Sequence, residues 1–172
     1  FSKYIDTKLN KLYTINDNLF VVIHALTSTG DWDLKFLGMQ IMIEGLALGA
    51  FGLIYKFTKE PLLRELLKQV ISDESRHVHY GVEALRDYYT KECPEYVRRD
   101  REDWAYEVTI MLRNRFMFTE FYEEYFTHAI SRENWIKMAL DSEIMAEFRR
   151  SLFSRLIPNL KAIGLFSDRI NP

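Results

Sequence analysis

Two glutamates and one histidine in the N-terminal half have the residue types and the spacing of a metal site. Glu44 lies fifteen positions before Lys59, and Glu74 lies fifteen positions after it. If antiparallel helices flank Lys59, a rise of about 1.5 Å per residue places both carboxylates at the same height, roughly 22 Å from the turn. His77 follows Glu74 by three residues and therefore shares its helix face. One glutamate would thus face a Glu-x-x-His pair across a helical hairpin.

This set of side chains suits a redox-active metal such as iron. Carboxylates are hard, anionic ligands that can bind one metal ion or bridge two, and imidazole adds a neutral nitrogen donor. A glutamate from one helix and a Glu-x-x-His pair from the next, present twice in a bundle, form the carboxylate-bridged di-metal sites. We therefore predict that Glu44, Glu74 and His77 are metal ligands and act directly in catalysis.

The surroundings of the two glutamates support this prediction. Glu44 lies in an apolar run, residues 41–50, that contains no basic residue. A buried carboxylate is costly unless it is protonated, paired or bound to metal, and an ion pair with a distant arginine is the ordinary alternative here. Beside Glu74, Asp73 is a candidate acceptor for the second N–H of a ligating histidine on another helix. Arg76 could pair with Asp73 or with another carboxylate.

Glu44, twenty-eight further residues and the run Asp73-Glu74-Ser75-Arg76-His77 resemble the second-half ligand motif of the ferritin-like di-iron carboxylate superfamily. Similar motifs occur in acyl-carrier-protein desaturases, p-aminobenzoate N-oxygenase, multicomponent monooxygenase hydroxylases and the small subunit of ribonucleotide reductase. The resemblance covers about residues 36–85. It implies a di-iron centre, or an Mn/Fe centre, that activates O2 to hydroxylate, N-oxygenate or desaturate a small organic substrate. It also implies an electron-donor protein, such as a ferredoxin or a reductase.

The sequence departs from that family pattern because it contains no second Glu-x-x-His. The nearest candidate, Glu124 with His128, has one residue too many between its members. Because residues 1–13 read as the middle of a protein, we expect the other half-site upstream of Phe1. The alternative is that two copies meet across a two-fold axis as a homodimer. A ferritin- or rubrerythrin-like protein that handles iron or peroxide, and a metal-free structural module, also remain open.

Helical periodicity and sparse glycine and proline predict an all-α bundle that forms one domain over residues 1–172. The resemblance implies that this bundle is ferritin-like. Asp31 is the expected N-cap of the apolar helix, and Thr58 or Glu60 that of the helix beginning at Pro61. The metal-binding hairpin would span residues 32–92, and the C-terminal helices residues 95–164, loosened near their end by Pro158 and Gly164. The predicted helices are 17–26, 32–57, 61–92, 95–130 and 133–156.

Composition excludes several other classes of function. The net charge of −2 gives no reason to expect a nucleic-acid partner. Cys93 is the single cysteine, which excludes an intrachain disulfide and a thiolate-rich zinc site and favours the cytoplasm. We identify no secretory signal. The most apolar stretch, residues 36–54, contains Gln40 and Glu44, so we expect a buried helix instead of a membrane span.

Overall fold

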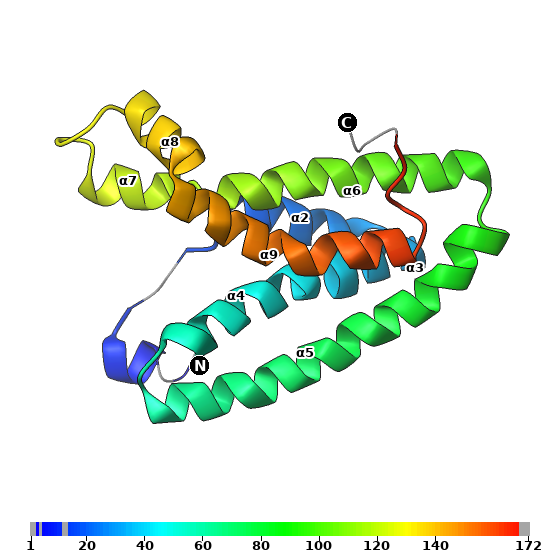
Figure 1. Cartoon of the computed structure of the whole chain (residues 1–172), viewed down its shortest axis with the longest axis horizontal. Coiled ribbons are helices and arrows are strands. Elements are labelled where there is room, and N and C mark those ends of the chain that lie inside the picture. The colour runs from blue at the N-terminus through cyan, green and yellow to red at the C-terminus, as the bar shows by residue number, and fades with distance from the viewer. Residues whose placement is uncertain (1–2, 4, 12–13, 169–172) are drawn as a thin grey trace.

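The computed structural model describes residues 3, 5–11 and 14–168, and all regular structure within them is helical (Figure 1). The predicted all-α bundle is thereby confirmed. The elements are η1 (Ile5–Leu9), α2 (Asp17–Ser28), α3 (Trp32–Phe36), η2 (Leu37–Ile43), α4 (Glu44–Phe57), α5 (Pro61–Asp87), η3 (Tyr88–Glu92), α6 (Glu95–Arg115), α7 (Thr119–Tyr125), α8 (Arg132–Asp141) and α9 (Glu143–Ala162), of which η1, η2 and η3 are π-helical.

The predicted hairpin is present. Elements α3, η2 and α4 form one continuous helix over residues 32–57, and α5 runs antiparallel beside it after a short turn (Figure 1). The carboxylate of Glu60 accepts a hydrogen bond from the backbone N–H of Leu63, and Pro61 occupies the first helical turn. Of the two candidate caps, Glu60 therefore begins α5, as a proline-initiated helix requires.

The helix over residues 32–57 lies in the centre of the bundle. It contacts α5 along one side and α9 along another, and α2 and α6 pack together against η2 (Figure 1). By length and composition alone this helix is also long and apolar enough to cross a membrane. The side chains buried between these elements are aliphatic and contribute about 1.5–3 kcal/mol each. Those without solvent exposure include Leu37, Ile41, Met42, Leu85, Leu152, Leu156 and Ile163.

A glycine sets the close approach of α4 to α9. A Cβ atom at Gly49 would lie 2.9 Å from the Cα atom of Leu152 and 3.0 Å from its carbonyl oxygen, whereas a Cβ atom at Gly52 would meet nothing within 4 Å. We expect Gly49→Ala to lower the free energy of unfolding by about 1–3 kcal/mol, because the obstacle is backbone. Gly52→Ala should raise it by about 0.5–1 kcal/mol through helix propensity. Chemical denaturation of both variants measures these free energies. Equal changes in the two variants would contradict the close contact between α4 and α9 at Gly49.

The C-terminal half differs from the predicted boundaries. The expected helix over residues 95–130 ends at Arg115, and Phe118 then adopts a left-handed conformation (φ 53°) before α7 begins. The expected helix over residues 133–156 is interrupted at Ser142, which is extended. Helix α9 also continues through Pro158 to Ala162, because Leu156 and Leu160 on either side are buried in the core. Neither break carries a glycine or proline in the sequence.

Asp31 is not the side-chain cap that its position predicted. Its carboxylate makes no capping hydrogen bond to the helix that begins at Trp32. Instead it accepts a hydrogen bond of 2.8 Å from the guanidinium of Arg101 in α6. A charged partner on a neighbouring helix has replaced the local backbone donor.

Candidate metal centre

The hairpin brings the three predicted ligands together. Glu44 is the first residue of α4, while Glu74 and His77 share one face of α5. His77 Nδ1 lies 3.2 Å from Glu74 Oε2 and 3.8 Å from Glu44 Oε2. One ligand atom from each residue lies within 4.8 Å of the others, so the group could hold a metal ion. Glu44 and Glu74 therefore face each other across the hairpin, as their equal distances from Lys59 predict.

The carboxylate of Glu44 lies in an environment that disfavours its charged form. Its Oε2 atom is buried and has no hydrogen-bond partner among the described residues. Burial raises the pKa of Glu44 above its ordinary value and the nearby charge of Glu74 raises it further, while His77 acts in the opposite direction. A buried oxygen without a donor is unfavourable in a protein interior. A bound cation would supply the missing partner, so these three side chains fit a metal ion.

The backbone before Glu44 is unusual. Element η2 is π-helical, and the backbone N–H of Glu44 bonds to the carbonyl of Met39, five residues earlier. Such segments within α-helices are rare and occur frequently at functional sites. One helical turn beyond His77, a Cβ atom at Gly81 would lie 2.6 Å from the Cβ atom of Gln40. The absence of a side chain at Gly81 therefore lets α5 pack closely on η2 beside the ligand group.

The ligand group opens to solvent on one side. The side chains of Glu44 and Glu74 are 18% and 24% exposed, but that of His77 is 56% exposed. The two remaining site residues lie outside the group: Arg76 pairs with Asp73 through a salt bridge, with both side chains exposed. This is one of the two expected pairings for Arg76. No described histidine contacts Asp73, so its role as acceptor for a ligating histidine stays a prediction.

A second polar cluster, which sequence reasoning missed, lies at the N-terminal end of the helix over residues 32–57. Asp33 is 3% exposed. Its Oδ2 atom accepts hydrogen bonds from the hydroxyl of Tyr89 at 3.0 Å and from Nε of Arg101 at 2.8 Å. Burial acts to raise the pKa of Asp33, but the hydrogen bond and charge of Arg101, together with Tyr89, outweigh it and hold the pKa below its ordinary value. Through these contacts Asp33 links the start of the central helix to η3 and α6.

Comparisons with protein-family models, with curated proteins and with solved structures found no match for this chain. The Glu44, Glu74 and His77 group in an all-helical fold is therefore the feature of this structure that points to a function.

Proposed function

We propose that the chain supplies Glu44, Glu74 and His77 to a carboxylate-bridged di-iron centre in an oxidoreductase that uses O2 to oxidise a small organic substrate. The carrying observation is the convergence of three ligand atoms within 4.8 Å around a buried carboxylate oxygen that has no hydrogen-bond partner among the described residues. Two carboxylates and one imidazole form a donor set that favours iron and leaves coordination positions open. When bound, the metal pair would supply the oxidising chemistry.

The chain's own residues would fix the geometry of that centre. Glu44 is held by the central helix and Glu74 by α5, so each carboxylate reaches the same point from an opposite wall. His77 would bind one metal ion from the more exposed side. A second glutamate and a second Glu-x-x-His pair must complete the site, from further helices of the polypeptide or from a second copy. An electron-donor protein would reduce the centre.

An apolar cavity along the helix that carries Glu44 favours an organic substrate over iron storage. A cavity of about 310 Å³ lies between α2, α4 and α6, and its lining is mostly hydrophobic. Ala47 and Phe51 in its wall follow Glu44 by about one and two turns of α4. Iron entry would require acidic groups along such a route, and none of the described residues that line this cavity is acidic. An oxidation of an organic molecule near Glu44 is therefore the better-supported reaction.

Iron binding should depend on His77 and not on His79. Both histidines are exposed on α5, but His79 is two residues further and points to a different helix face, which makes it a matched control. We expect His77→Ala to weaken Fe(II) binding by roughly 100-fold or more, since even residues that merely orient a ligand affect affinity 10–100-fold. Anaerobic Fe(II) titration, followed by metal analysis and near-ultraviolet absorbance after exposure to O2, measures this.

His79→Ala should bind iron as the unaltered protein does. Failure of the unaltered protein to bind iron, or equal losses in both variants, would refute the proposal. Molecular mass measured with and without iron locates the second ligand set. Doubling of the mass on loading would assign it to a second copy of the chain.

A further inference from the structure

The cavity between α2, α4 and α6 has one cationic side chain among the described residues of its wall. It is lined by hydrophobic residues of α2, α4 and α6, among them Leu19, Ala47 and Leu112, and by Arg115 at the end of α6. Its volume of about 310 Å³ is within the range of small-molecule sites. A site of this kind binds an apolar body and fixes its orientation through the one charged group.

Arg115 also borders a second cavity, of about 580 Å³, so it stands where the two cavities adjoin. The arginine is half-buried, and its guanidinium forms no hydrogen bond or ion pair within the part of the chain that the structure describes. Asp17 and Glu120 line the second cavity without bridging to Arg115, and Glu120 instead accepts a hydrogen bond from the side chain of Asn16. A guanidinium with five free donors is suited to bidentate recognition of a carboxylate.

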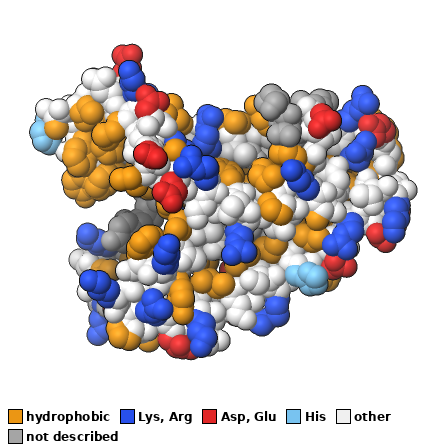
Figure 2. Space-filling model, in the orientation of Figure 1, with side chains coloured by type: hydrophobic (Ala, Val, Ile, Leu, Met, Phe, Trp, Pro, Cys, Tyr) orange, Lys and Arg blue, Asp and Glu red, His pale blue; other side chains and the backbone are white. Residues whose placement is uncertain are grey.

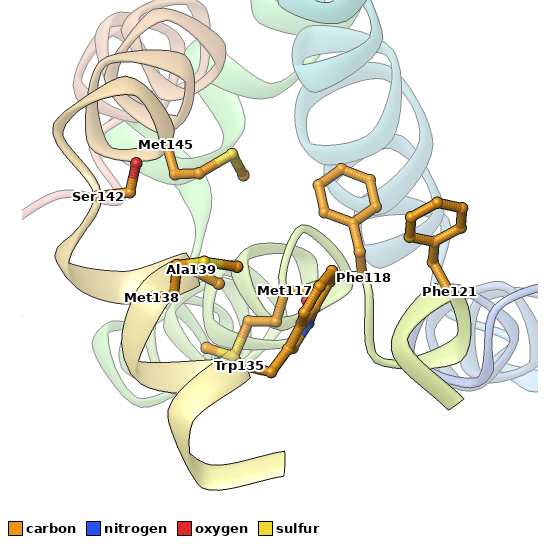
Figure 3. A pocket seen from close by; sticks show the side chains of 8 residues that line it. All are labelled: Met117, Phe118, Phe121, Trp135, Met138, Ala139, Ser142 and Met145. Carbon is orange, nitrogen blue, oxygen red and sulfur yellow. The ribbon is translucent and has the colours of Figure 1, made fainter. Parts of the chain in front are cut away.

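A third cavity, of about 500 Å³, lies under the arm formed by α7 and α8 and shares Phe118 and Phe121 with the second. Figure 2 shows hydrophobic side chains gathered on this arm beside a hollow in the surface. In Figure 3, Trp135 and Met138 from α8 and Met145 from α9 turn toward the same space as Phe118. Within the described part of the chain, the residues that line this cavity are uncharged, so they offer apolar contact without a group that would select an anion.

We propose that Arg115 and the cavity between α2, α4 and α6 bind an organic acid, with the carboxylate on the guanidinium and the apolar body along Ala47 and Phe51. This orientation would direct the far end of the molecule along α4 toward Glu44. Binding of the acid stands on the cavity and on Arg115 alone, whereas its role as the oxidised substrate rests on the proposed function.

Isothermal titration of the metal-free protein with decanoate, and separately with decan-1-ol, tests the site without iron. We expect one decanoate per chain, bound about tenfold more tightly than the alcohol, because an ionic hydrogen bond is lost with the alcohol. Arg115→Met should weaken decanoate about tenfold and leave decanol unchanged, and Arg115→Lys should restore part of the loss. Arg113→Met, on the same helix but outside all three cavities, should bind like the unaltered protein.

Two further variants test where the apolar chain of the ligand binds. Ala47→Leu fills the proposed cavity and should weaken both ligands, whereas Met138→Glu, in the arm cavity, should weaken neither. Thermal melts followed by circular dichroism show that each variant is folded. Absence of decanoate binding, equal affinities for acid and alcohol, or loss of binding only in Met138→Glu would overturn the proposal. Decanoate binding that survives while the protein takes up no iron would refute the di-iron function and leave the acid site standing.

Discussion

Replacing Asp33 by alanine should lower the free energy of unfolding by about 3–5 kcal/mol, the range for breaking one side of a buried ion pair. Asp33 is 3% exposed, and the guanidinium of Arg101 beside it has a side chain only 13% exposed. The substitution would also leave the hydroxyl of Tyr89, which is 1% exposed, without its acceptor. Urea denaturation at neutral pH, with the unaltered protein alongside, measures the loss.

Asp31→Ala is the matched control for this experiment. Asp31 accepts from the same arginine but its side chain is 56% exposed, so we expect a loss below about 1 kcal/mol. Equal losses in the two variants would mean that burial of Asp33 is not what makes its contact valuable. If Asp33→Ala left the free energy of unfolding unchanged, Asp31 and Asp100, which Arg101 also contacts, would be sufficient partners for Arg101.

The contribution of Asp33 should also depend on pH. Because Arg101 and Tyr89 hold its folded-state pKa below the unfolded value near 3.8, the folded protein binds fewer protons in that interval and stability rises with pH there. The contribution is complete above pH 3.8 and is lost as the pH falls through the folded-state pKa. The difference in unfolding free energy between the unaltered protein and Asp33→Ala should therefore shrink on acidification. A difference that stays constant down to acid pH would contradict this linkage.

The ligand hairpin was predictable because its signals are local. Helical rise and two equal intervals about Lys59 determine the relative height of Glu44 and Glu74, and Pro61 with Glu60 marks the turn. Nothing in that argument required knowledge of distant contacts. The Asp33 and Arg101 pair is different, because 68 residues separate its members and no periodicity links them. Only the packing of α6 across the start of the central helix brings the two together.

The boundaries in the C-terminal half could not be predicted for a related reason. The chain turns at Phe118, a bulky residue with positive φ, where sequence signals favour continued helix. The turn lets Trp135 donate its indole N–H to the carbonyl of Met117 at 2.8 Å, a contact between distant segments. Tertiary packing has therefore overridden local preference at this point. The π-helical segment before Glu44 could not be predicted from the sequence either, because its residues are as apolar as their neighbours.

Glu44→Met should stabilise the metal-free protein while it removes iron binding. The carboxylate of Glu44 has a buried oxygen without a hydrogen-bond partner among the described residues, and an unsatisfied buried group of this kind costs about 1–3 kcal/mol. Methionine is unbranched, has a similar helix propensity and fills a similar volume without a polar atom. We expect the free energy of unfolding to rise by about 1–3 kcal/mol and Fe(II) affinity to fall by roughly 100-fold or more.

The opposite signs of these two effects distinguish a ligand from a structural residue. If Glu44 were held by an ion pair, as the ordinary interpretation of a buried carboxylate requires, Glu44→Met would destabilise the protein. Glu83→Met is the control, since Glu83 is an exposed carboxylate of α5 that pairs with the similarly exposed Arg86. This variant should change neither stability nor iron affinity appreciably. Where a carboxylate is retained because it binds a metal, we expect it to lower the stability of the metal-free protein. Gain of stability with loss of iron in Glu44→Met alone would therefore assign Glu44 to metal binding.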